Sequence, residues 1–303
     1  MIKVADVKYI RLRAPDLDKM ETFLTDFGLV RSDRTDTALY MRGTDNEHHI
    51  HVTELGEPGF IGMAFDAARE ADLDAISRLD GAGEVHEMDE PGGGKRVILH
   101  DPDGLRIEIV AGMETVEPIQ VKEVFEFNSG SRRRRVGPFV RSGPRPSQVK
   151  RLGHIVLSCG KFKECQDFYM GTLGMLTSDF LHDDNDDSIV KANFMRCNRG
   201  QEYVDHHTVL ITDRGEAALG HVAFEVEDWN DLNVGHWYLQ TKDYVHNFGM
   251  GRHILGSQLF DYWADPWGHN HEHWTDGDLL NEDTPYGKYP LHTARDIQWG
   301  PGR

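Results

Sequence analysis

Residues 259–274 read Leu259-Phe-Asp-Tyr-Trp-Ala-Asp-Pro-Trp-Gly-His-Asn-His-Glu-His-Trp274, and this stretch predicts a β-hairpin. Two apolar and aromatic runs flank Asp265-Pro-Trp-Gly268, a tetrad with the Asp, Pro and Gly that β-turns prefer. Side chains alternate between the two faces of a strand, so Glu272 points away from the neighbouring His271 and His273. Any histidine that acts together with Glu272 must therefore come from elsewhere in the chain.

A second Asp-Pro-x-Gly turn indicates an internal repeat. His100-Asp-Pro-Asp-Gly-Leu-Arg-Ile-Glu108 matches residues 264–272, with a glutamate seven residues after the aspartate in both. Three further pairs occur in the same order: Tyr9–Arg13 with His154–Ser158, Glu47–Thr53 with Asp205–Thr212, and Gly62–Asp66 with His221–Glu225. Matches that keep one order along the chain indicate two similar halves.

Each half divides again into two modules, so we predict an α+β fold of four βαβββ modules in two homologous domains. The modules cover about residues 5–55, 58–112, 150–213 and 218–276, with helices expected over about 18–28, 67–79, 162–174 and 228–240. We expect the N-terminal domain at 1–135, a connector at 136–150 and the C-terminal domain at 151–303. The tail after residue 276 contains tryptophan and is expected to pack on the body.

Composition restricts the partners of this chain. Its 33 basic and 51 acidic residues give a net charge of −18, which argues against binding to nucleic acid or to an anionic membrane. The arginines at 132–135 are therefore interpreted as a solvated or subunit-interface segment. No apolar run approaches the roughly 20 residues of a membrane span, and Met1–Val7 lacks a signal-peptide core. Three cysteines without CxxC spacing disfavour a thiolate zinc site, and we expect a cytoplasmic protein.

A metal site is predicted from the differences between the halves. The second half has His154, His221 and Glu272, whereas the first half has Tyr9 and Gly62 at the positions of the histidines. Two imidazoles and a carboxylate occupy one face of an octahedral ion and leave positions open for a bidentate substrate and O2. The open positions and the lack of thiolates favour Fe(II), or alternatively Mn(II), over structural zinc. Each histidine is expected to begin a strand whose apolar continuation disfavours an unpartnered imidazole.

Three further residues are candidates for proton transfer. His207 lies fourteen residues before His221, Tyr262 lies ten before Glu272 across the hairpin, and His253 lies nine before Tyr262. A tyrosine and two neutral histidines beside a metal suit proton transfer and hydrogen bonding to an anionic substrate. Structural roles stay open, because Tyr262 also fits a half-buried strand position and a His-His pair occurs in the first half without ligands. The histidines that alternate with Glu272 are expected to pack or to face solvent: His269, His271 and His273.

These features together resemble the type I extradiol ring-cleaving dioxygenases of the vicinal oxygen chelate superfamily, which includes glyoxalases and bleomycin resistance proteins. The resemblance implies two partly open mixed β-barrels with outer helices, the N-terminal one free of metal and the C-terminal one catalytic. It implies an oxidoreductase that cleaves a small aromatic diol of the catechol type with both atoms of O2, at a mononuclear non-haem Fe(II) held by His154, His221 and Glu272. His207 corresponds to the acid–base histidine, accompanied by His253 and Tyr262.

The resemblance further implies a homo-oligomer that acts in the catabolism of aromatic compounds. Leu255 and Gly256 stand where the biphenyl-type branch has Asn and Asp, so the identity of the catechol and the bond that is cleaved stay open. Some relatives carry an arginine from the C-terminal segment over the site, and Arg295 is the candidate here.

Two other functions are considered. A glyoxalase-like metal-dependent isomerase or transferase on the same fold would take ligands from paired modules, and the lack of both histidines in the first half counts against it. A binding protein that sequesters a ligand would need no metal ligands at all.

Overall fold

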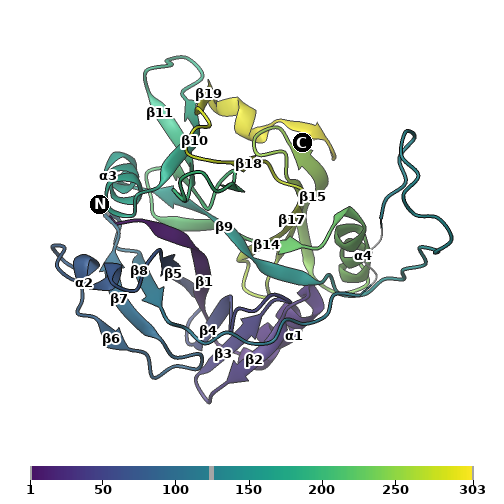
Figure 1. Cartoon of the computed structure of the whole chain (residues 1–303), viewed down its shortest axis with the longest axis horizontal. Helices are drawn as coiled ribbons and strands as arrows, with labels where there is room; N and C mark the ends of the chain where they lie inside the picture. Colours follow the sequence, from purple (N-terminus) through teal and green to yellow (C-terminus); the bar gives the residue numbers. More distant parts are fainter. Residues whose placement is uncertain (1, 123–125, 302–303) are drawn as a thin grey trace.

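Two mixed β-sheets, one from each half of the chain, form the body of the molecule (Figure 1). The computed structural model describes residues 2–122 and 126–301. The first half contains β1 (Val4–Ala14), α1 (Leu17–Phe27), β2 (Val30–Arg34), β3 (Ala38–Arg42), β4 (His51–Leu55), β5 (Gly59–Ala67), α2 (Asp72–Ile76), β6 (His86–Glu87), β7 (Lys95–His100) and β8 (Arg106–Ala111).

The second half repeats this order with additions. It contains β9 (Val149–Cys159), α3 (Phe162–Asp167), the π-helical turn η1 (Phe168–Thr172), β10 (Leu176–His182), β11 (Val190–Arg196), β12 (Val204–Asp205), β13 (Val209–Asp213), β14 (Ala218–Val226), α4 (Trp229–Leu239), β15 (Val245–His253), β16 (Leu259–Ala264) and β17 (Asn270–Thr275). The C-terminal segment adds β18 (Leu279–Leu280), β19 (Gly287–Pro290), the 3-10 helix η2 (Leu291–Arg295) and β20 (Ile297–Trp299).

The strand orders confirm the four predicted βαβββ modules. The first sheet runs β2-β3-β4-β1-β5-β8-β7-β6, and the second contains the corresponding series β10-β11-β13-β9-β14-β17-β16-β15. In each sheet two modules meet at an antiparallel pair, β1 with β5 and β9 with β14, while β4, β8, β13 and β17 run parallel to these central strands. Among the described strands, the two at the ends of each sheet do not pair with each other, so each sheet stays partly open.

The two halves share one hydrophobic core. A continuous cluster of buried apolar side chains includes residues of both sheets, and Phe27 of α1 meets Phe224 of β14 with ring centroids 5.9 Å apart. The backbones also approach closely, because a Cβ on Gly43 would lie 2.0 Å from the carbonyl oxygen of Lys150. A side chain at residue 43 would therefore force the halves apart.

Three local predictions differ from the structure. The helix predicted over residues 67–79 is confined to Asp72–Ile76, because β5 continues through Ala67, which pairs with Val4. His154 and His221 lie inside their strands rather than at the beginning. β9 begins at Val149 and β14 at Ala218, because each strand extends by several residues before the histidine and its apolar continuation. The remaining predicted helices correspond to α1, to α3 with η1, and to α4.

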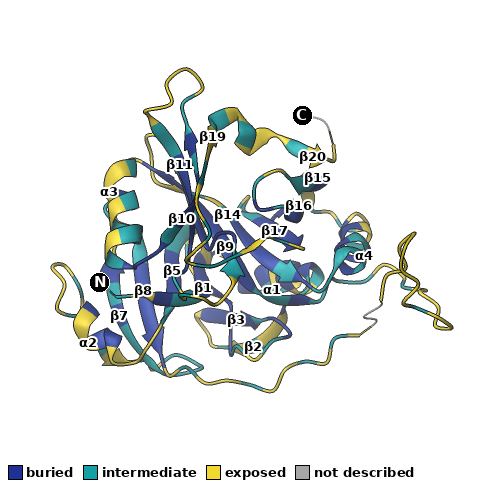
Figure 2. Ribbon diagram, turned by 45° about the horizontal axis from the view of Figure 1, so that its top comes forward, coloured by how far each residue is buried: buried dark blue, intermediate teal, exposed yellow. Residues whose placement is uncertain are grey.

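The segment between β8 and β9 is mostly exposed and irregular (Figure 2). Among the described residues of this segment, Thr115 forms an isolated antiparallel β-bridge with Glu47 of the first half. Arg132 to Arg135 are largely exposed. Residues 1, 123–125, 302 and 303, which the predicted domain boundaries include, lie outside the described residues. The boundaries at 135 and 150 stay a prediction.

The C-terminal tail packs on the body, as predicted, and it spans the second sheet from edge to edge. β19 pairs with β10 at one edge, β20 pairs with β15 at the other, and η2 connects them (yellow in Figure 1). We call residues Gly287–Trp299 the strap. Within residues 2–122 and 126–301, no helix has both the length and the apolar character that crossing a membrane requires.

Candidate metal centre

Three neighbouring strands bring His154, His221 and Glu272 to one face of the second sheet. In the sheet register, Ala223 of β14 pairs with His154 of β9 on one side and with Glu272 of β17 on the other. His221 precedes Ala223 by two residues and therefore shares its face. Because the residue between the imidazole and the carboxylate is an alanine, its small side chain leaves room in front of it.

The three side chains converge on one oxygen. Nε2 of His154 and Nε2 of His221 each lie 3.1 Å from Oε2 of Glu272, and one ligand atom from each residue lies within 4.8 Å of the others. Glu272 is fully buried and His154 is 1% exposed. Oε1 of Glu272 has no hydrogen-bond partner among the described residues. A buried acceptor without a partner costs about 1–3 kcal/mol, and two imidazoles with a carboxylate fit a divalent ion that would bind it.

The protonation states suit metal binding. Burial alone would raise the pKa of Glu272, but the nearby imidazoles of His154, His221 and His253 hold that pKa well below its usual range. Burial lowers the pKa of His154. A carboxylate and a neutral imidazole are the forms that bind a metal ion.

His207 lies directly beside the ligand His154. Their ring centroids are 4.2 Å apart, and His207 is 3% exposed. Burial lowers the pKa of His207 well below its usual range, and the nearby His154 lowers it further. Nδ1 of His207 lies 3.1 Å from Nδ1 of His206, whose Nε2 lies 2.8 Å from Oδ2 of Asp179. This buried chain of Asp179 and His206 was not predicted, because the two residues are far apart in sequence.

Tyr262 and His253 lie on the other side of the site. Tyr262 pairs with Glu272 in the β16–β17 register, as predicted from the hairpin, and its ring centroid lies 5.1 Å from that of His221. Nε2 of His253 lies 2.9 Å from the Tyr262 hydroxyl and 3.8 Å from Oε1 of Glu272. All six candidate residues are therefore brought together.

A cavity of about 690 Å³ opens in front of this group. It is lined by five of the six candidates, with Glu272 buried beneath them. Gln258 also lines it, is 2% exposed, and its Nε2 has no hydrogen-bond partner among the described residues. Gln258 was missed because a single glutamine in a loop gives no sequence signal. Thr293, Ala294 and Asp296 of the strap complete the lining, whereas the candidate Arg295 is exposed and is not among the lining residues.

The corresponding place in the first half holds cations of the protein itself. Glu108 occupies the same register position as Glu272, opposite an alanine, and is 1% exposed. The Tyr9 hydroxyl donates to it at 2.7 Å, and nitrogens of Arg11, Arg96 and Arg106 lie 3.0, 3.0 and 2.9 Å from its oxygens. The three guanidinium groups supply the positive charge beside this carboxylate that a metal ion would supply in the second half.

The histidines that alternate with Glu272 face away from the site. The ring of His273 stacks on Phe27 with centroids 3.7 Å apart, and His271 contacts Phe27 edge-on at 5.7 Å. His269 pairs with Asp265 at 2.9 Å. The prediction that these histidines pack rather than bind the metal agrees with these contacts.

Two other clusters of possible metal ligands among the described residues lack the features of this site. Asp261 accepts hydrogen bonds from His236, His246 and Trp263, which satisfies the carboxylate without an ion. Asp103 lies near the thiols of Cys159 and Cys165 but accepts from the backbone N–H groups of Gly160 and Lys161.

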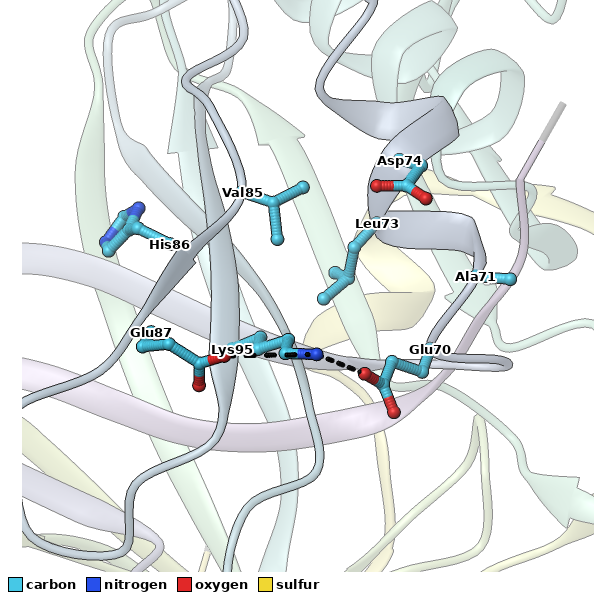
Figure 3. A pocket seen from close by; sticks show the side chains of 8 residues that line it. All are labelled: Glu70, Ala71, Leu73, Asp74, Val85, His86, Glu87 and Lys95. Carbon is cyan, nitrogen blue, oxygen red and sulfur yellow. Dashed lines mark hydrogen bonds and ion pairs between the residues drawn. The ribbon is translucent and has the colours of Figure 1, made fainter.

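A separate cavity of about 420 Å³ lies in the first half beside α2 (Figure 3). There Lys95 lies between Glu70 and Glu87, with its Nζ 2.7 and 3.9 Å from their carboxylate oxygens. Lys95 therefore pairs with two of the three carboxylates that line this cavity.

Comparisons with known proteins match both halves of the chain. Residues 6–109 match the model of the Glyoxalase/Bleomycin resistance protein/Dioxygenase superfamily. The chain is 28% identical over 302 residues to metapyrocatechase 2 of Cupriavidus necator, which covers 98% of this chain and 89% of the relative.

Two solved structures illustrate the likeness of the fold. A Mn(II)-bound glyoxalase from Novosphingobium aromaticivorans aligns with a TM-score of 0.81 and 22% identity, over 100% of this chain and 93% of the other. A substrate complex of homoprotocatechuate 2,3-dioxygenase from Brevibacterium fuscum aligns with a TM-score of 0.79 and 22% identity, over 99% and 90%.

The repeat provides a matched control for metal binding. We predict that the wild-type chain binds about one divalent ion and that Glu272→Ala lowers the bound metal at least tenfold, because the remaining imidazoles lack their carboxylate. Glu108→Gln changes the corresponding residue of the first half and should leave the metal content unchanged. Metal would be measured by mass spectrometry on folded protein after gel filtration. Equal losses in both variants would contradict the assignment of the site to the second half.

Proposed function

We propose that the chain belongs to the glyoxalase/bleomycin resistance protein/dioxygenase superfamily and that it is an extradiol dioxygenase that opens the ring of a catechol-type substrate with O2. The observation that carries the proposal is the convergence of His154 and His221 on one oxygen of the buried Glu272. A catechol needs two adjacent coordination positions and O2 needs a third, and a ligand set confined to one face leaves these positions open.

We propose that His154, His221 and Glu272 hold Fe(II), with Mn(II) as the alternative. The donor set is two nitrogens and one oxygen, without thiolates, which suits either ion. When bound, the metal would bring catechol and O2 together and pass electron density between them. The relation to metapyrocatechase 2 of Cupriavidus necator supports a catechol as the substrate.

His207 is proposed as the acid–base residue. If His206 donates from Nε2 to Asp179, its Nδ1 is free to accept the proton that Nδ1 of His207 donates. His207 then presents an unprotonated Nε2 and, since it lines the cavity, can accept a proton from a catechol hydroxyl. Burial keeps the imidazole neutral until it receives that proton.

Tyr262 and His253 are proposed to hold the substrate oxygens. Nε2 of His253 lies 2.9 Å from the hydroxyl of Tyr262, so the two groups share one hydrogen bond and their polar atoms lie side by side. Both line the cavity, with Tyr262 beside His221, whereas His207 lies beside His154. A substrate bound at the metal would therefore lie between one group that takes up a proton and a pair that stabilises negative charge on its oxygens. We further expect a homo-oligomer that acts in the cytoplasm in aromatic catabolism.

A glyoxalase-like isomerase or transferase is the second candidate. The alignment with the Mn(II)-bound glyoxalase from Novosphingobium aromaticivorans, at a TM-score of 0.81, favours it. The two functions differ in their need for O2, because an isomerase transfers protons within its substrate and consumes no oxygen.

The central test is oxygen uptake with a panel of catechols. We predict that protein reconstituted with Fe(II) under air consumes O2 and forms a yellow ring-opened product from at least one simple, alkylated, carboxylated or bicyclic catechol. The measurements are an oxygen electrode and visible absorbance. Absence of turnover across the panel, together with activity on an α-keto aldehyde thiol adduct without O2, would replace this function with the second candidate.

The role of His207 has its own test. His207→Phe removes the proton acceptor but not a metal ligand, so we predict a loss in kcat of about 10²–10⁴-fold with bound metal retained. Metal content and kcat would be measured on the same sample. His100→Phe, at an exposed histidine of the first half, is the control and should keep both values. Loss of the metal from the His207 variant would refute the assigned role.

A further inference from the structure

The metal cavity is lined by polar side chains and by a set of apolar ones. Its lining includes Val156, Phe194, Leu210, Leu219, Phe248 and Leu255. Apart from histidines, the charged side chains among the described lining residues are Arg214, Glu216 and Asp296, all of which are exposed. Charge is therefore confined to the rim, where water can solvate it.

One apolar wall begins directly at the acid–base residue. Phe194 of β11 is 7% exposed and meets His207 edge-on, with ring centroids 5.0 Å apart. The cluster that contains Phe194 packs against Leu210, Leu255 and Leu291, the last of which belongs to the strap. This wall is built from both the sheet and the strap, so a group bound against it would be removed from water.

A second apolar surface begins at the other pair of proposed catalytic residues. Phe248 of β15 stacks on Phe260 at 5.2 Å and lies 6.4 Å from the ring of Tyr262. A catechol whose oxygens lie between His207 and Tyr262 would thus direct the rest of its ring towards phenylalanine on both sides.

The strap contributes a small side chain rather than a cation. Ala294 lines the cavity and its neighbour Arg295 does not, although both residues are exposed. The remaining cation of the lining, Arg214, lies two residues from the rim carboxylate Glu216. The chain as a whole carries a net charge of −18, which adds to the cost of bringing in an anion.

These observations separate two classes of catechol. A ring carboxylate held against the apolar walls would leave water and meet no buried cationic side chain among the described lining residues, and such a transfer is strongly unfavourable. An alkyl or aryl substituent gains from the same walls, by about fourfold in affinity for each methylene group that is buried.

Building on the function proposed above, we propose that the substrate is a catechol with an uncharged apolar substituent. The substituent lies against Phe194 and Phe248, beneath Ala294 of the strap, and the site discriminates against catechols that carry a carboxylate.

The test compares catechol, 3-propylcatechol, 4-propylcatechol and 3,4-dihydroxyphenylacetate on the Fe(II)-loaded enzyme. Anaerobic Kd by calorimetry and kcat/KM under air are both measured. At least one propylcatechol should exceed catechol by about tenfold or more in both quantities, and the carboxylated compound should fall below catechol by a similar factor. Preference for the carboxylated compound, or equal values throughout, overturns this inference while leaving the dioxygenase assignment intact. Failure to cleave any of the four contradicts the proposed function instead.

A pair of neighbouring strap variants tests the location of the substituent. Ala294→Trp places a large side chain in the cavity and should lower the ratio of propylcatechol to catechol kcat/KM at least fivefold. Arg295→Trp adds the same side chain one residue along, outside the lining, and should leave this ratio unchanged. An unchanged ratio in the Ala294 variant, or an equal change in both variants, contradicts the proposed position.

Discussion

The site depends on how a buried carboxylate is neutralised. Oε2 of Glu272 lies 3.1 Å from both His154 and His221, and the three strands that carry these residues are held in register around Ala223. A fully buried carboxylate with an unpartnered second oxygen is costly unless positive charge approaches it. We therefore propose that a metal cation occupies this point, and the open positions of that cation define the chemistry that we propose.

In the first half, protein side chains neutralise the corresponding buried carboxylate. Glu108 stands at the matching register position, but the residues around it are Tyr9, Arg11, Arg96 and Arg106. Guanidinium groups neutralise the carboxylate, and they leave no coordination position open for a substrate. The glutamate and its turn are thus common architecture, and the residues on the adjoining strands determine whether the position supports a fold or binds a metal.

Local sequence patterns and the internal repeat predict much of the fold and of the candidate site. The turn at residues 265–268 sets the hairpin register, which places Tyr262 opposite Glu272, and the repeat identifies the strands that carry the two histidines. The short α2 was missed because pairing of Ala67 with Val4 extends β5, an interaction between distant residues. Three other features likewise depend on tertiary structure: the contact of His206 with Asp179, the position of Gln258, whose Nε2 has no partner among the described residues, and the path of the strap between β10 and β15.

The central claim is that this site inserts both atoms of O2 into an aromatic ring. The most direct measurement is mass spectrometry of the product formed by the Fe(II)-loaded protein from a cleaved catechol under ¹⁸O2. The account predicts a ring-opened product that carries label from O2 in both new oxygen positions, apart from label that exchanges with water. A product without label, formed equally well in the absence of O2, would contradict it.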